Sequence, residues 1–193
     1  MHSADRVETR ETDERLRQLQ QAARALRQAE STAQWTQILA DTAARFASVV
    51  LFCRVDSGSL FCDAARGAAQ PAEAIPLAGA FRQAVDTKEN VVALHTPSEI
   101  SDMVIDAIAA PARRAYLFPL VGKTRVLGVL LAEGLPDVHA LELLMTIAAA
   151  TLELREVRPA TPLIAPAPRA EHTETRKDLV TAAKSILAAG SVK

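Results

Sequence analysis

The stretch YLFPLVGKTRVLGVL, residues 116–130, decides the fold of this chain. Two runs of apolar and β-branched residues flank the polar segment Gly122-Lys123-Thr124, which is the pattern of two strands joined in a hairpin. We therefore expect antiparallel strands over residues 115–121 and 125–133. Gly128 interrupts the second strand, and a residue without a side chain there indicates a bend at the sheet edge or the close crossing of a helix.

The segments upstream of this hairpin predict a second hairpin and several short elements. β-branched and aromatic residues fill 48–55, the turn residues Asp-Ser-Gly-Ser occupy 56–59, and the chain returns as a strand over 60–65. The other upstream elements are expected to be a loop over 68–76, a helix over 77–86, a strand over 90–95 and a short helix that Pro111 closes.

Helices are expected on both sides of these strands. Behind a cap at Ser31 or Thr32, apolar residues recur at the spacing of a helix lying on a core: Trp35, Ile38, Leu39, Thr42, Ala43 and Phe46. A second long helix is expected from Asp137 to Val157. Strands that pair in hairpins between terminal helices are typical of the α+β class.

The order of these elements resembles the GAF domain family over residues 31–157. The Pro119-Leu120 step, the polar turn and the following strand Leu127-Gly128-Val129 carry most of the resemblance, and the flanking helices also fit. The resemblance implies a central antiparallel sheet of about five to six strands, with the N- and C-terminal helices packed on one face and a ligand pocket on the other. Domains of this family mostly regulate an attached effector or a partner.

Known variants of the family leave no catalytic or cofactor assignment. The chain lacks the Asn-Lys…Phe…Asp-Glu constellation of cyclic-nucleotide-binding members, and residues 96–113 hold no Cys to attach a bilin. GAF-like free methionine sulfoxide reductases use cysteines in a different number and placement, so we expect no enzyme. The expected function is a sensory or regulatory module that binds a small ligand and passes a signal to a partner. The alternative is a structural adaptor with a filled pocket, and the cofactor stays unknown.

Five residues are candidates for ligand binding beside the segment 96–113: His95, Asp102, Arg113, Arg114 and Tyr116. His95 ends a strand next to the implied pocket, where a ring nitrogen can bond a ligand. The two arginines suit a carboxylate or phosphate. Asp102 and Asp106 lie one helical turn apart, but no nucleophile accompanies them, which favours a solvated helix face. His95 and the arginine pair also have a plain alternative as loop residues in solvent.

The two cysteines are expected to face each other. A turn at Ser57-Gly58 sets Arg54 opposite Phe61 and Cys53 opposite Cys62, where Cβ atoms lie about 4.5–5.5 Å apart. A disulfide needs about 3.5–4.5 Å, so a bridge there would be strained and reducible. The pair is either two small buried apolar side chains or a redox sensor. Two thiols without a further His or Cys make a poor zinc site, so no metal is expected.

The C-terminal helix carries two apolar stripes, and a sheet covers only one of them. Leu141, Leu144, Met145, Ala148 and Leu152 form the first. The second stripe recurs at intervals of four and three residues: Leu143, Ile147, Ala150, Leu154 and Val157. It is expected to form a homodimer bundle, or alternatively to pack on the Trp35 helix in the same chain.

The chain ends add extensions to this domain. Residues 1–30 predict a helical arm with a short coiled-coil seam at Leu16, Leu19, Ala23 and Leu26, which either dimerises or lies in solvent. Residues 158–170 are a Pro-rich linker, and residues 171–193 are a tail with a short helix. The arm or tail is a candidate contact for a protein partner.

The bulk composition bounds the compartment and partners. A net charge of −1 over 193 residues favours neither nucleic acid nor an anionic membrane as partner. Two cysteines and the lack of a leader or a spanning apolar run favour the cytoplasm.

Overall fold

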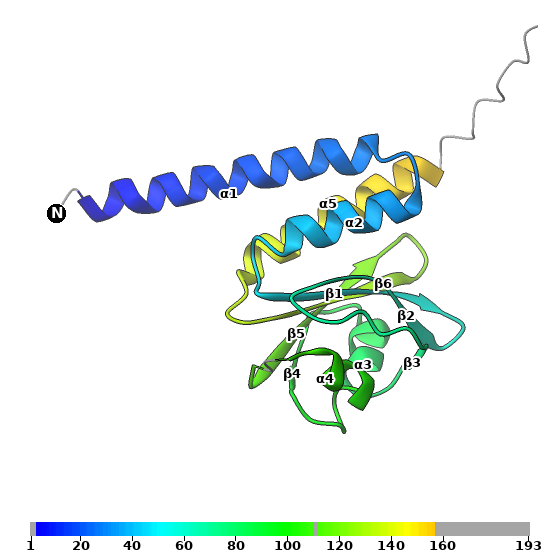
Figure 1. The fold of residues 1–193 in the computed structure, drawn as a ribbon. Helices are drawn as coiled ribbons and strands as arrows, with labels where there is room; N and C mark the ends of the chain where they lie inside the picture. Colours follow the sequence, from blue (N-terminus) through cyan, green and yellow to red (C-terminus); the bar gives the residue numbers. More distant parts are fainter. Residues whose placement is uncertain (1–2, 110–111, 157–193) are drawn as a thin grey trace, which may run out of the picture. The chain divides into compact units, whose positions relative to one another are not determined.

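The computed structural model describes residues 3–109 and 112–156, and the side chains of residues 12–109 and 112–155. It confirms the α+β class, with a six-stranded sheet in the order β3-β2-β1-β6-β5-β4 whose pairings are all antiparallel (Figure 1). The strands are β1 (Val49–Asp56), β2 (Ser59–Arg66), β3 (Ile75–Pro76), β4 (Val91–Leu94), β5 (Arg114–Val121) and β6 (Val126–Glu133). The short strand β3 lies in a segment that was expected to be a loop.

The β1–β2 hairpin forms in the expected register. Ser57 and Gly58 have φ angles of 49° and 81°, and two positive φ values at a two-residue turn follow the twist of the strands it joins. Cys53 pairs with Cys62 and Arg54 with Phe61, as the turn position predicts. The register shifts by one residue before Cys53, so this stretch of the hairpin is less regular than an ideal ladder.

The Phe52 ring of the neighbouring strand β1 leaves no room for a side chain at Gly128 of β6. A Cβ atom built on this glycine would lie 2.8 Å from the Phe52 ring and 2.9 Å from the Cys53 carbonyl oxygen. The Phe52 ring packs edge-on against Trp35, with 6.0 Å between the ring centroids. The close approach expected at Gly128 is real, but a side chain of β1 makes it rather than a crossing helix.

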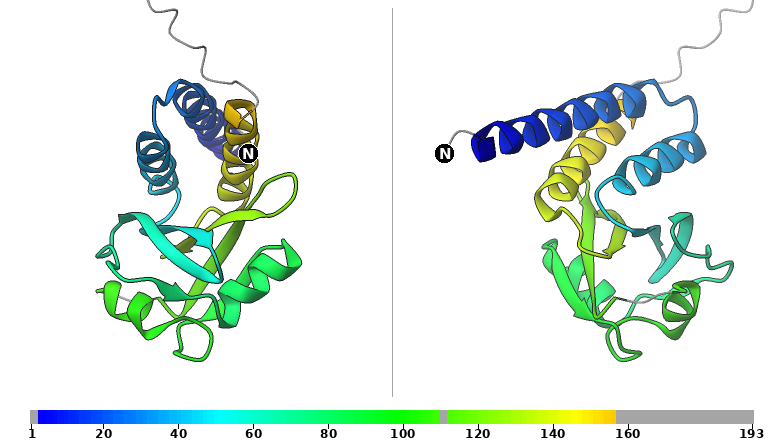
Figure 2. Two further views of the ribbon diagram at one scale, coloured as in Figure 1. Left: turned by 90° about the vertical axis from the view of Figure 1, so that its right-hand side faces the viewer. Right: turned by 60° about the vertical axis from the view of Figure 1, so that its left-hand side comes forward.

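Three helices lie on one side of the sheet: two of them cover the strands, as expected for the chain ends, and the first packs on those two. They are α1 (Ser3–Gln28), α2 (Thr32–Ala43) and α5 (Val138–Glu156), and Figure 2 shows α2 and α5 side by side above the strands. Ser31 caps α2 by accepting a bond from the Gln34 amide at 3.1 Å. The Trp35 indole N–H donates to the Thr151 hydroxyl at 3.2 Å and so joins α2 to α5.

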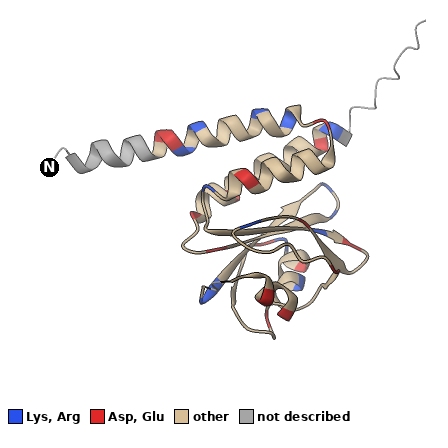
Figure 3. Ribbon diagram, in the orientation of Figure 1, with Lys and Arg blue, Asp and Glu red and all other residues tan. Residues whose placement is uncertain are grey.

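The other face carries the short helices α3 (Gly79–Thr87) and α4 (Asp102–Ala107) over a second apolar cluster. Cys53, Phe81 and Leu117 are among its buried members. The sheet is therefore buried on both faces. Basic and acidic residues are interspersed over the described elements (Figure 3).

The helix expected as an arm packs on the domain along one side. Leu19 and Leu26 of α1 are buried, whereas Leu16 is half exposed. The predicted linker 158–170 and tail 171–193 lie outside the described residues. Within the described ranges, every helix is too short or too polar to cross a bilayer.

Candidate functional site

A buried carboxylate lies at the end of β6, beneath the segment that follows β4. Glu133 is fully buried, and by alternation along β6 it shares the face of Leu131, on the side of α3 and α4. Its Oε1 lies 2.8 Å from the His95 Nδ1, and its Oε2 accepts a bond from the Ala112 amide at 3.0 Å. The His95 amide in turn donates to the Arg113 carbonyl oxygen at 3.4 Å. These bonds hold the His95 ring in one orientation.

The contact with Glu133 relates the His95 tautomer to the charge of the carboxyl group. An ionised Glu133 oxygen only accepts, and beside it the His95 Nδ1 carries the proton and donates. The opposite ring nitrogen, Nε2, has no hydrogen-bond partner among the described residues. It is also shielded from water, because the His95 side chain is only 8% exposed. A buried nitrogen without a partner costs free energy. The carboxylate therefore orients the ring and leaves its far nitrogen as the unpaired polar atom of this contact.

Arg113 and Arg114 lie beside His95 through the backbone, but none of the other expected ligand residues makes a side-chain bond to it within the described residues. The side chains of Asp102, Arg113 and Arg114 are exposed. Tyr116 is half-buried against the cluster beneath α1, α2 and α5, which is the opposite face of the sheet. Among the five candidates, His95 is the one whose side chain the structure buries in a polar contact.

Glu133 was not anticipated from the sequence. The signal was present, because a Glu ends the otherwise apolar run Val129-Leu130-Leu131-Ala132 at a position that alternation turns inward. A charged residue at an inward position needs a buried partner. Which residue would be that partner depends on strand order, and the sequence does not contain it.

Cys53 and Cys62 form a second polar contact, in the cluster under α3. Both thiols are free and buried, and they are hydrogen-bonded to each other. This bond and burial raise the pKa of Cys53 well above its ordinary value. The same bond, together with a backbone hydrogen bond at Ala64, lowers the pKa of Cys62. Cys62 is therefore the thiol that ionises first.

The second stripe of α5 is largely uncovered in a single chain. Leu143 and Leu154 are 46% and 61% exposed. Ala150 is also exposed and Ile147 is half-buried, while Val157 lies outside the described residues.

No group of three or more potential metal ligands occurs in the part of the chain that the structure describes.

Comparison with known proteins identifies the fold. No family model matches the sequence, and no curated protein does. Among solved structures, the GAF domain of a phosphoenolpyruvate-protein phosphotransferase from Coxiella burnetii is similar with a TM-score of 0.61 and 14% identity over 74% of this chain and 95% of that one. A methyl-accepting chemotaxis protein, residues 122–287, is similar with a TM-score of 0.59 and 17% identity over 74% of this chain and 99% of that one.

A third similar structure is an enzyme. Free methionine-R-sulfoxide reductase from Neisseria meningitidis, solved with its substrate, has a TM-score of 0.55 and 24% identity over 72% of this chain and 89% of that one. Together these likenesses establish that the chain has the GAF fold. They also overturn the expectation that it is not an enzyme, which rested on the number and placement of the cysteines, because the same fold carries a reductase.

Proposed function

We propose that this chain is a sensory module that recognises a small ligand through His95 and passes the signal through its helical layer. The observation that carries the proposal is the buried Nε2 of His95, which Glu133 orients and no described residue satisfies. A ligand that supplies this missing hydrogen bond stabilises the bound state. Two of the similar structures are a GAF domain of a phosphotransferase and part of a chemotaxis protein, and both support a regulatory setting.

The signal would leave through the opposite face. β6 carries Glu133 on one side and contributes Leu130 and Ala132 to the cluster beneath α1, α2 and α5 on the other. A shift of this strand therefore reaches α5 directly. The exposed stripe on α5 fits a second copy of the chain, and a partner protein would contact the helical arm or the tail.

The test uses a substitution that removes only the unpaired nitrogen. An asparagine at position 95 places an amide N–H where the Nδ1–H donates to Glu133 but has no counterpart of Nε2. A thermal-shift screen of small metabolites on the unmodified protein should find a stabilising compound, worth about 2.7 kcal/mol at a hundredfold excess over Kd. The same compound should lose at least about tenfold in affinity on His95→Asn, since one buried hydrogen bond is gone.

The screen also separates the adaptor alternative. Twenty buried apolar residues fill the face under α3 and α4, which favours an adaptor with a filled pocket. If no compound stabilises the protein, or if a stabilising compound binds His95→Asn equally well, sensing through His95 is refuted and the adaptor stands.

Thiol chemistry is a second candidate, favoured by the shared hydrogen bond of Cys53 and Cys62. In this candidate a peroxide oxidises the Cys62 thiolate to a sulfenic acid and is reduced to water. The Cys53 thiol then attacks that sulfur, water leaves, and a disulfide remains. Mass spectrometry after mild peroxide treatment should find the Cys53–Cys62 link before any link between chains. Oxidation to sulfinic acid without a link would reject the candidate.

A further inference from the structure

A cavity of about 470 Å³ opens on the helical face of the sheet, away from His95. Its lining comes from α2, α5 and the ends of both hairpins. The apolar part of the wall consists of Trp35, Phe52, Val55, Leu120, Leu127 and Leu152. A cavity of this volume with a mainly apolar wall accommodates a small organic molecule. None of the five candidate ligand residues from the sequence lines it.

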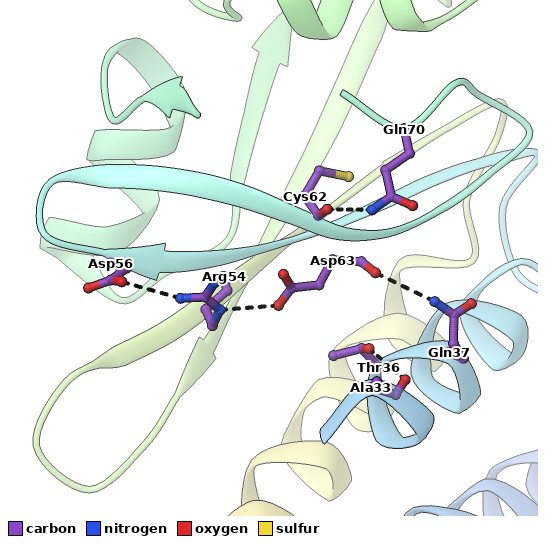
Figure 4. A network of polar contacts seen from close by, with 8 residues as sticks. All are labelled: Ala33, Thr36, Gln37, Arg54, Asp56, Cys62, Asp63 and Gln70. Atoms are coloured by element: carbon purple, nitrogen blue, oxygen red, sulfur yellow. Dashed lines mark hydrogen bonds and ion pairs between the residues drawn. The ribbon is translucent and has the colours of Figure 1, made fainter. Parts of the chain in front are cut away.

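The charged part of this wall is unbalanced. Arg54, Arg125 and Arg155 line the cavity together with Asp56 and Asp63. Arg54 bonds both aspartates, at 3.4 Å and 3.3 Å, and Figure 4 shows its side chain between theirs. Both acidic groups are therefore already paired with one arginine. The three arginines and two aspartates leave a net charge of +1 at the cavity, and the side chains of Arg125 and Arg155 are the ones without an acidic partner in the described part of the chain.

The side chains of Arg155 and Arg125 have no hydrogen-bond or ion-pair partner among the described residues. The Nη1 of Arg155 is buried and unsatisfied. Arg125 is exposed and ends the turn of the β5–β6 hairpin. In the same turn, the Lys123 Nζ lies 3.9 Å from the Glu153 Oε2 of α5. A buried guanidinium N–H without an acceptor costs free energy, and an anion is the group that removes the cost.

We propose that this cavity binds an organic anion with an apolar body, such as an aryl or acyl carboxylate or sulfonate. The anionic group would bond Arg155 and Arg125, whose planar forks match carboxylate oxygens. The apolar body would lie along Trp35 and Leu152. The site joins α2, α5 and both hairpins, so its occupation would hold the helical layer on the sheet. This proposal is independent of a ligand at His95, which lies on the other face.

A matched pair of fluorescent probes tests it. Anilinonaphthalene sulfonate carries the anion and the apolar body, and N-phenylnaphthylamine carries the body alone. The sulfonate should bind the full chain more tightly than the neutral probe. Arg155→Gln and Arg125→Gln should each weaken the sulfonate about tenfold, the usual effect of losing a bond to a charged group, and leave the neutral probe unchanged.

Location and charge need their own controls. Arg82 is an exposed residue of α3 on the opposite face of the sheet. Arg82→Gln removes the same charge there and should leave the affinity for the sulfonate unchanged. Trp35 is the only tryptophan in the chain, so its single indole N–H resonance should shift as the sulfonate saturates.

Three outcomes would overturn the proposal. Equal affinity for both probes removes the role of charge, and unchanged binding by both arginine variants removes their role. A Trp35 resonance that stays in place at saturation puts the probe elsewhere. If Arg155→Gln fails to fold, Arg125→Gln decides alone, because the Arg125 side chain is exposed in a turn.

Discussion

Glu133 shows how a single charged residue is tolerated in the middle of this fold. Removing a carboxylate from water is costly, and the cost is offset only by bonds to the charged oxygens. His95 and the Ala112 amide supply those bonds, one to each oxygen. The same two bonds fix where the His95 ring lies. The polar contact therefore has a structural role and a site role together.

Removing that carboxylate should destabilise the domain strongly. Glu133→Ala leaves two buried donors, the His95 Nδ1–H and the Ala112 N–H, without an acceptor, and should cost about 2–4 kcal/mol of the free energy of unfolding. Urea denaturation followed by circular dichroism measures the change. Glu89→Ala, at an exposed position after α3, is the control and should stay within about 0.5 kcal/mol. A Glu133 variant as stable as this control would show that the buried contact contributes nothing.

The two thiols should react at different pH. The pKa of Cys62 is lowered and that of Cys53 is raised, mainly by their shared hydrogen bond. Because the thiolate is the reactive form, alkylation of Cys62 should begin at a lower pH than for an ordinary thiol, and Cys53 should follow only in alkaline solution. Mass spectrometry of iodoacetamide-treated protein across pH separates the two. In Cys53→Ala the pH profile of Cys62 should move upward, and an unmoved profile would refute the hydrogen bond as the cause.

At the scale of elements, the sheet core depends on the fit between β1 and β6. Gly128 leaves the space that Phe52 occupies, and Phe52 in turn packs on Trp35 of α2. Trp35 is bonded to Thr151 of α5. One missing side chain in β6 thus lets two helices and two strands meet.

A methyl group at Gly128 should disturb all of these contacts. Gly128→Ala places a carbon within 3 Å of the Phe52 ring and the Cys53 carbonyl oxygen, and overpacking of this kind typically costs about 1–3 kcal/mol. Thermal unfolding and the Trp35 emission maximum report the loss and the displaced ring. Phe52→Leu combined with Gly128→Ala should recover part of the stability. A single variant that unfolds like the unmodified protein would mean that the ring moves aside freely.

At the scale of the whole molecule, the open question is what covers α5. Leu143 and Leu154 are exposed, and a buried leucine at an interface contributes about 1.5–3 kcal/mol. Leu154→Glu should therefore turn a dimer into a monomer, as measured by light scattering on a sizing column. Leu135→Glu is the control, because Leu135 is 99% exposed and lies in the loop before α5. An unmodified protein that is monomeric at high micromolar concentration would refute pairing through α5.

The sequence by itself determined the main elements and their local pairing, but it did not predict the short strand β3. Alternation and turn residues act over short distances, so the register that sets Cys53 opposite Cys62 follows from the turn alone. The residues from Pro119 to Gly128 likewise predicted the β5–β6 hairpin. The apolar spacing from Trp35 onward predicted α2. These predictions rest on neighbours in the chain.

Only the tertiary structure decided which distant residues meet. His95 and Glu133 are 38 positions apart and Trp35 and Thr151 are 116 apart. Strand order brings the first pair together and helix packing the second, and neither follows from local pattern. The same packing buried Leu19 and Leu26 of the expected coiled-coil seam within one chain and left the α5 stripe exposed. It also gathered Arg125 and Arg155 at one cavity from two separate elements. The apolar spacing of a helix indicates that one of its faces must be buried. It does not indicate which residues bury that face, because many partners satisfy the same hydrophobic requirement. Long-range packing decides which partner does so.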